Sequence, residues 1–132
     1  MKILVVEDDF ISRRLMQKFL VSYGDCDIAV NGREALMAFD MAWQEGKPYD
    51  LITLDIMMPE MDGQRALAEI RSAEEKKGIS GPDGVKVIMT TALSDPENVM
   101  TAFKSQCEAY LIKPIARENL ITILNALDLV KG

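Results

Sequence analysis

The fold is decided by the stretch Tyr49-Asp-Leu-Ile-Thr-Leu-Asp-Ile-Met-Met-Pro-Glu-Met-Asp-Gly63. Residues 51–54 are nearly all apolar, which is the pattern of a strand buried on both faces. Pro59 and Gly63 then interrupt regular structure. Asp55 is therefore expected at the carboxyl end of a central strand, where open α/β sheets bind their ligands. The alternative is an ordinary loop acid, because aspartate is common in turns.

Strands and helices alternate along the rest of the chain. Short apolar runs predict strands, and apolar residues three or four positions apart predict helices with one buried stripe. The expected strands are Lys2–Val6, Cys26–Val30, Leu51–Asp55, Val85–Thr91 and Ala109–Ile112, and the expected helices are Ser12–Tyr23, Arg33–Gln44, Gln64–Lys77, Pro96–Ser105 and Arg117–Val130. Strict alternation with short connections implies a parallel sheet with helices on both faces. The predicted fold is a flavodoxin-like, doubly wound α/β sheet of five parallel strands in the order 2-1-3-4-5, with five helices.

Length and composition limit the kind of protein this can be. The 132 residues are expected to form one domain, residues 1–132, which is large enough to bury its own core. The apolar fraction of 48% is ordinary, and no apolar run approaches the ~20 residues of a membrane-spanning helix. Cys26 and Cys107 lie far apart, and no signal peptide precedes the first strand. We therefore expect a cytoplasmic protein with reduced thiols and no membrane partner.

Charge and histidine content exclude further classes of protein. The formal net charge of −6 disfavours binding to the phosphate backbone of a nucleic acid. The chain contains no histidine, which removes the commonest general base, the usual zinc ligand and any phosphohistidine intermediate. A phosphoryl donor of the phosphohistidine type would therefore have to be another protein.

Residues able to do chemistry follow four of the five predicted strands. Because the strand ends of a parallel sheet all point one way, these residues should converge: Glu7, Asp8, Asp55, Thr91 and Lys113. Clustered acids repel one another, and carboxylates with a backbone carbonyl form the oxygen ligand set that suits Mg²⁺. Lys113 and the Thr91 hydroxyl could bind a phosphoryl group, which Asp55 could accept covalently. The ordinary alternatives are helix-capping acids, a β-branched strand residue and a solvated surface lysine.

Five motifs occur together in this chain. They are Ile3-Leu-Val-Val-Glu-Asp8, Asn31-Gly-Arg-Glu-Ala35, Asp55-Ile-Met-Met-Pro59 through Asp62-Gly63, Thr90-Thr-Ala92 and Tyr110-Leu-Ile-Lys-Pro114. With them the chain resembles a bacterial two-component receiver domain along essentially its whole length, and is similar to the single-domain chemotaxis regulators. The resemblance implies that Asp55 is the phosphoacceptor and that Thr91 and Lys113 contact the phosphoryl group. It also implies that Tyr110 is the aromatic residue whose rotamer reports activation. The implied Mg²⁺ ligands are Glu7, Asp8, Asp55 and the backbone carbonyl of Met57.

Two features of this chain differ from the family pattern. Three acids occur in a row where the family uses two, and we assign the pair to Glu7-Asp8 because it follows the strand directly. Asp9 would then begin the helix. The loop Lys76–Gly84 is longer than usual in the family. Because it joins a helix to the amino end of a strand, it should lie on the side of the sheet away from Asp55.

The resemblance also leads to expectations about geometry and kinetics. The Lys113–Pro114 peptide is expected to be cis, since proline lowers the cost of that form to about 0.5–1 kcal/mol. In receivers the side chains at Met57 and Leu93 flank the path by which water reaches the phosphoryl group. Both are apolar here and cannot orient a water molecule, so hydrolysis of the phosphorylated form is expected to be slow.

The expected function is that of a phosphorylation-dependent response regulator. It is a signalling domain rather than an enzyme, although it assists its own phosphorylation and dephosphorylation. The donor would be a sensor histidine kinase or a phosphotransfer protein. Phosphate would draw Thr91 inward, Tyr110 would follow, and the face made by the fourth helix, fifth strand and fifth helix would bind a downstream protein. The phosphorylated form could be a homodimer.

Three alternatives to the receiver function stay open, as does the question whether an output domain follows this chain. A flavodoxin-like cofactor carrier is disfavoured because Glu7-Asp8-Asp9 would repel a phosphate after the first strand. A haloacid dehalogenase-type hydrolase needs a second acid two residues after its nucleophile, where this chain has Met57. A non-phosphorylated pseudo-receiver that only binds partners is disfavoured because all the site residues are present. The chain ends after the fifth predicted helix without room for an output domain, although a truncated chain would look the same.

Overall fold

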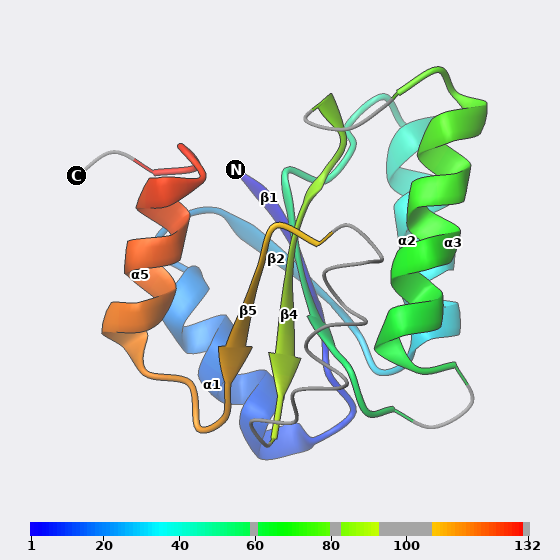
Figure 1. The fold of residues 1–132 in the computed structure, drawn as a ribbon. Coiled ribbons are helices and arrows are strands. Elements are labelled where there is room, and N and C mark those ends of the chain that lie inside the picture. Colours follow the sequence, from blue (N-terminus) through cyan, green and yellow to red (C-terminus); the bar gives the residue numbers. More distant parts are fainter. Residues whose placement is uncertain (59–60, 80–82, 93–106, 131–132) are drawn as a thin grey trace.

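We describe the protein from a computed structural model, which defines residues 1–58, 61–79, 83–92 and 107–130 (Figure 1). The elements in these ranges are β1 (Lys2–Val6), α1 (Phe10–Leu20), β2 (Asp25–Ala29), α2 (Gly32–Gln44), β3 (Leu51–Asp55), α3 (Gly63–Lys76), β4 (Lys86–Thr91), β5 (Ala109–Ile112) and α5 (Arg117–Ala126). All neighbouring strands are parallel, in the order β2-β1-β3-β4-β5, which confirms the predicted sheet. The predicted helix Pro96–Ser105 lies outside the described residues. None of the helices within those ranges has the length and apolar content to cross a membrane.

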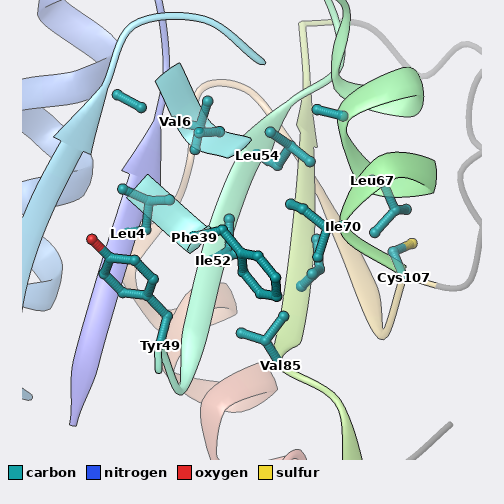
Figure 2. Packing of buried hydrophobic residues seen from close by; sticks show 14 of the residues in the cluster. Leu4, Val6, Phe39, Tyr49, Ile52, Leu54, Leu67, Ile70, Val85 and Cys107 are labelled. Atoms are coloured by element: carbon teal, nitrogen blue, oxygen red, sulfur yellow. The ribbon is translucent and has the colours of Figure 1, made fainter. Parts of the chain in front are cut away.

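Helices cover both faces of the sheet (Figure 1): α2 and α3 lie on one face, and α1 and α5 on the other. Successive side chains of a strand point to opposite faces. In β1, Leu4 and Val6 therefore belong to the core beneath α2 and α3, which Figure 2 shows, with Phe39 of α2 at its centre. Ile3 and Val5 belong to the core beneath α1 and α5. Because the central strands are packed from both sides, their ends are held rigidly.

The starts of α1, α2 and α3 are set by polar residues at their N-caps. The side chains of Asp9, Asn31 and Asp62 each accept a hydrogen bond, 2.8 to 2.9 Å long, from the backbone N–H three residues ahead. Such a bond satisfies one of the donors that a helix start leaves free. As a result α1 begins at Phe10, and the predicted start at Ser12 was two residues late.

Two predicted helix ends were too late. The first helix ends at Leu20, not Tyr23, because the Tyr23 N–H donates to the Leu20 carbonyl in a tight 3₁₀-type turn (2.9 Å). The last helix ends at Ala126, not Val130, because the backbone at Asp128 is left-handed, with a φ of 58°. The predicted start of β4, the predicted start of α2 and both predicted ends of β2 and α3 differ from the observed ones by one residue, which is the usual uncertainty of such boundaries.

A partly buried ion-pair cluster lies at the amino end of β4, on the side of the sheet away from Asp55. Arg71 of α3 contacts Glu74 (2.8 Å) and Glu108 (2.9 Å). Glu74 accepts a hydrogen bond from Val85 N–H (2.7 Å), and Glu108 accepts one from Val87 N–H (2.6 Å). The two carboxylates thereby bind the start of β4. The described ends of the α3–β4 loop lie at this edge, opposite the carboxyl ends of the strands, as predicted.

Candidate functional site

The register of the sheet brings the predicted site residues together. Val6 of β1 is paired with Leu54 of β3, so the residues that follow them, Glu7 and Asp55, lie side by side. On the other side of β3 lies β4, and beyond β4 lies β5. The last paired residue of β5 is Ile112. Lys113 comes next. Since neighbouring strands are about 4.8 Å apart, these strand ends form one small site.

Three carboxylates meet at this edge of the sheet. Glu7, Asp8 and Asp55 each offer an oxygen, and these oxygens all lie within 4.8 Å of one another. Only 5% of Glu7 and 4% of Asp55 is exposed, whereas Asp8 is open to solvent. Oxygens in this arrangement fit the ligand set of a hard divalent cation, with one side left open to water or to a phosphate. The three acids predicted to bind metal are thus adjacent.

Lys113 provides a positive charge within the same cluster. Its ammonium group forms an ion pair with Glu7 and lies 3.3 Å from Asp55 Oδ2. The Lys113 N–H also donates to the Thr91 carbonyl (2.7 Å), which continues the pairing of β4 and β5 beyond the last strand residue. The Lys113–Pro114 peptide is cis, and that prediction is confirmed. One lysine facing three acids leaves a formal excess of negative charge when all of them are ionised.

The environment of the cluster shifts the proton affinities of two of its groups. Burial, reinforced by the neighbouring Asp55 carboxylate, raises the pKa of Glu7 to about 7, although Lys113 acts in the opposite direction. For Lys113, burial lowers the pKa, but the contacts with Glu7 and Asp55 outweigh it and the pKa lies above the ordinary value. Glu7 therefore exchanges its proton near neutral pH, while Lys113 stays charged.

The loop after β1 is held by a residue that the sequence did not point to. Arg13 of α1 donates to the carbonyls of Glu7 (3.1 Å) and Asp8 (3.4 Å). The Asp9 N–H donates to the second oxygen of Glu7 (3.2 Å), and the Asp9 side chain caps α1. Glu7 and Asp8 thus face the cluster, while Asp9 faces the helix. A signal for Arg13 would have been its place one helical turn beyond the cap, but many surface arginines share that spacing.

The loop after β3 folds back on Asp55. The Met57 N–H approaches Asp55 Oδ1 (3.3 Å), and the Gly63 N–H donates to the Ile56 carbonyl (2.9 Å). The side chain of Met57 points outward and is 65% exposed. The backbone of Met57 is therefore close to the Asp55 carboxylate, while Met57 is largely exposed to solvent. Leu93, the other residue expected there, lies outside the described residues.

The two residues predicted to form the switch lie on neighbouring strands, β4 and the edge strand β5. Thr91 is the last residue of β4 and is buried. Tyr110 of β5 is partly buried and packs against the core beneath α2 and α3. Register pairs Thr91 with Ile112, two residues beyond Tyr110 on the same strand. The end of β4 is thus paired directly with the strand that carries the tyrosine.

Comparison with known proteins agrees with this arrangement. Residues 3–125 match the family model of the response regulator receiver domain. The chain is 35% identical over 127 residues to the chemotaxis protein CheY of Listeria monocytogenes, covering 94% of this chain and 95% of that protein. It is 33% identical over 124 residues to hybrid signal transduction histidine kinase L of Dictyostelium discoideum, covering 93% of this chain but 7% of that protein.

Solved structures give the same result. A chain of the CheX–CheY–BeF3–Mg complex of Borrelia burgdorferi has a TM-score of 0.82 and 25% identity, covering 99% of this chain and 90% of that one. A receiver domain of Francisella response regulator 1452 is 33% identical, with a TM-score of 0.70, covering 96% of this chain and 94% of that one. The sequence match over nearly the whole length and the shared fold lead to one conclusion: this chain belongs to the response regulator receiver domain family, a family of two-component signalling domains.

Proposed function

We propose that this protein accepts a phosphoryl group on Asp55 from a sensor histidine kinase or a phosphotransfer protein. The observation that carries the proposal is the setting of Asp55, which is nearly buried at a strand end, 3.3 Å from the Lys113 ammonium, with two further acids beside it. The chain contains no histidine, so the phosphohistidine of such a donor lies outside these 132 residues. A receiver of this kind is a signalling domain that takes part in its own chemistry.

In the proposed reaction a carboxylate oxygen of Asp55 attacks the phosphorus atom. The bond between phosphorus and the donor nitrogen breaks, and an acyl phosphate forms on Asp55. Lys113 binds one of the phosphoryl oxygens, and the Thr91 hydroxyl binds another as the group arrives. Thr91 ends β4, the strand beside β3, and the Lys113 ammonium already lies 3.3 Å from Asp55, so both need little rearrangement to do so.

The acids of the cluster are proposed to hold Mg²⁺. The residues fit the ion, because three carboxylates with one lysine leave negative charge to be balanced and their oxygens are close enough to share one cation. Glu7, Asp8, Asp55 and the Met57 carbonyl would be the ligands. The ion would neutralise charge on the phosphoryl group during transfer. The Borrelia complex that resembles this chain contains Mg²⁺, which supports the choice of metal.

The output is proposed to be a contact with a downstream protein. Inward movement of Thr91 would free space into which Tyr110 turns, and this would change the face made by β5 and α5. The predicted helix Pro96–Ser105, which the proposal adds to this face, lies outside the described residues. Some relatives of the chain are much longer than it, so receivers are also used as parts of larger proteins. Whether this chain acts alone, and whether its phosphorylated form is a homodimer, are tested by gel filtration of the phosphorylated and unphosphorylated protein.

The competing proposal is a pseudo-receiver that binds partners without being phosphorylated. One experiment separates the two: incubation with acetyl phosphate and Mg²⁺, followed by intact mass spectrometry. The proposed function predicts the addition of one phosphoryl group per chain, and its loss when Mg²⁺ is removed with a chelator. A mass that stays unchanged under conditions that label a known receiver would favour the pseudo-receiver.

The affinity for Mg²⁺ is expected to depend on pH. Because the pKa of Glu7 is raised to about 7, a proton competes with the cation below that pH. The apparent affinity should therefore increase by about tenfold between pH 6 and pH 8. Titration calorimetry with MgCl2 measures it. In Glu7→Gln, which has no proton to lose there, binding should be weaker and nearly independent of pH. An equal affinity at pH 6 and pH 8 in the wild type would contradict this role of Glu7.

The phosphorylated form is expected to be long-lived. The exposed Met57 side chain and Leu93 offer no hydrogen-bonding group to orient an attacking water. The double variant Met57→Asn, Leu93→Glu should therefore lose phosphate about tenfold faster than the wild type. Its Mg²⁺ affinity should change little, since only the carbonyl of Met57 is proposed as a ligand. Decay of phosphorylated protein, followed by intact mass, measures this. Equal rates would mean that these side chains are surface residues without a kinetic role.

A further inference from the structure

Gly63, the first residue of α3, lies against the backbone of the proposed phosphoacceptor. A Cβ atom placed on Gly63 would overlap the Asp55 carbonyl oxygen, and it would lie 2.8 Å from the Asp55 carbonyl carbon and 2.9 Å from Ile56 Cα. Ordinary contacts of a Cβ atom begin at 3.4 Å. All three are backbone atoms of Asp55 and Ile56. The helix can approach β3 this closely only because residue 63 has no side chain.

The requirement for glycine here is one of space and not of backbone conformation. Among the described glycines, positive φ angles occur at Gly46 and Gly78, whereas the backbone at Gly63 has an ordinary helical conformation. Alanine could adopt the same φ and ψ without strain. A substitution at Gly63 therefore acts through the atoms that the methyl group would meet.

The packing of α3 determines which side would yield to that methyl group. The helix is anchored by Ala66, Leu67 and Ile70, all of which are fully buried. Its start is also fixed by the capping bond from Asp62. Moving α3 away from the sheet would open the core, which costs more than turning one peptide group. The peptide that follows Asp55 is therefore the part that shifts.

A shift of that peptide would reach the chemistry directly. The Gly63 N–H holds the Ile56 carbonyl (2.9 Å), and the Met57 N–H contacts Asp55 Oδ1 (3.3 Å). The same short segment thus orients the Asp55 carboxylate and carries the Met57 carbonyl. Displacement by about 1 Å is enough to disturb a reacting group by ~10²-fold in rate.

We infer that Gly63 is a positioning residue, which sets the Asp55 carboxylate and the Met57 backbone for Mg²⁺ binding and phosphoryl transfer by allowing α3 to touch the Asp55 peptide. The inference rests on the proposed function of Asp55. It assigns to one glycine an effect on the site that is separate from its effect on stability, and the two can be measured separately.

The test compares Gly63→Ala with a matched glycine at the other end of the sheet. A Cβ atom on Gly24 would overlap the Met1 carbonyl oxygen and lie 2.7 Å from its carbon, so Gly24→Ala produces a similar backbone clash far from the acids. Both variants are measured well below their melting temperatures. Titration calorimetry with MgCl2 gives the Mg²⁺ dissociation constant, and intact mass with acetyl phosphate gives the labelling rate.

Gly63→Ala is expected to weaken Mg²⁺ binding about tenfold and to slow labelling by roughly 10²-fold, while Gly24→Ala changes both by less than about twofold. Equal effects of the two variants, whether large or small, would overturn the inference. If Gly63→Ala does not fold, Gly32→Ala decides the question, because a Cβ atom there would meet the carbonyl oxygen of Met61 (2.8 Å) on the other side of the same loop. Weaker Mg²⁺ binding in Gly32→Ala than in Gly24→Ala would support the inference, and equal binding would overturn it.

The outcome also distinguishes the inference from the proposed function. A wild-type protein that is labelled while Gly63→Ala is labelled equally fast overturns only the role of Gly63. A wild-type protein that is not labelled overturns the proposed function of Asp55, and the inference with it.

Discussion

Asp55→Asn is expected to abolish phosphoryl labelling. The amide that replaces the carboxylate is neutral and a far weaker nucleophile, yet it has nearly the same shape, so the fold should be retained. Asp55 is only 4% exposed and lies at the end of a strand packed on both faces. No acid from a neighbouring loop can therefore move into the position of its carboxylate. Labelling with acetyl phosphate and Mg²⁺, read by intact mass, should fall below detection.

A matched control shows whether the loss is specific to Asp55. Glu7→Gln makes the same kind of change, from a carboxylate to an amide, at the acid beside it in the cluster. That variant should still be labelled, although more slowly, because it loses a proposed metal ligand and not the acceptor. Full labelling of Asp55→Asn would mean that another acid accepts the group. Complete loss in both variants would leave the identity of the acceptor open to either residue.

Asp8→Ala is expected to remove most of the stabilisation by Mg²⁺. At a Mg²⁺ concentration 100 times its dissociation constant, binding stabilises the wild type by about 2.7 kcal/mol. For a domain of this size that corresponds to an increase in Tm of roughly 10 °C. Loss of one of three carboxylates should weaken binding by on the order of 100-fold, which leaves about 0.4 kcal/mol at the same concentration. Thermal melts with and without MgCl2 measure the difference.

Asp9→Ala is the natural control, because it tests the choice between the adjacent acids. Asp9 caps α1 through the Ser12 N–H (2.8 Å), so its loss should cost about 1 kcal/mol of stability with and without Mg²⁺. The increase in Tm caused by Mg²⁺ should nevertheless be that of the wild type. The opposite result, with the Mg²⁺ effect kept in Asp8→Ala and lost in Asp9→Ala, would show that the metal-binding pair is shifted by one residue.

Much of the site could be predicted because its residues stand at the ends of apolar runs, and these runs predict buried strands. Leu51–Asp55 has the composition of a doubly buried strand, and parallel strands place their carboxyl ends together, so the meeting of Glu7, Asp55 and Lys113 followed from topology. The ion pair between Lys113 and Glu7 did not follow, because it depends on register and rotamers. Nor did the support from Arg13, since its contacts are with backbone carbonyls that leave no trace in the sequence.

Two features of the fold were not predictable from the sequence, each for its own physical reason. The helical sequence around Glu74 is typical of a solvent-exposed face. In the structure Glu74 is buried, where it accepts a hydrogen bond from the Val85 N–H and pairs with Arg71. The last helix was predicted to continue beyond Ala126 because apolar residues continue at helical spacing. The left-handed backbone at Asp128 ends it without a glycine or proline to mark the place. The burial of Glu74 thus depends on a tertiary contact and the end of the helix on one backbone conformation, and the local sequence pattern shows neither.

The most direct test of the account is chemical identification of the phosphorylated residue. Borohydride reduces an acyl phosphate of aspartate to the alcohol, homoserine, and leaves free carboxylates unchanged. The wild-type protein is treated with acetyl phosphate and Mg²⁺, reduced, digested and sequenced by tandem mass spectrometry. The account predicts homoserine at position 55 and at no other aspartate, and none when Mg²⁺ is withheld. Homoserine at another position, or none in a protein that binds Mg²⁺, would contradict the assignment of Asp55 as the phosphoacceptor.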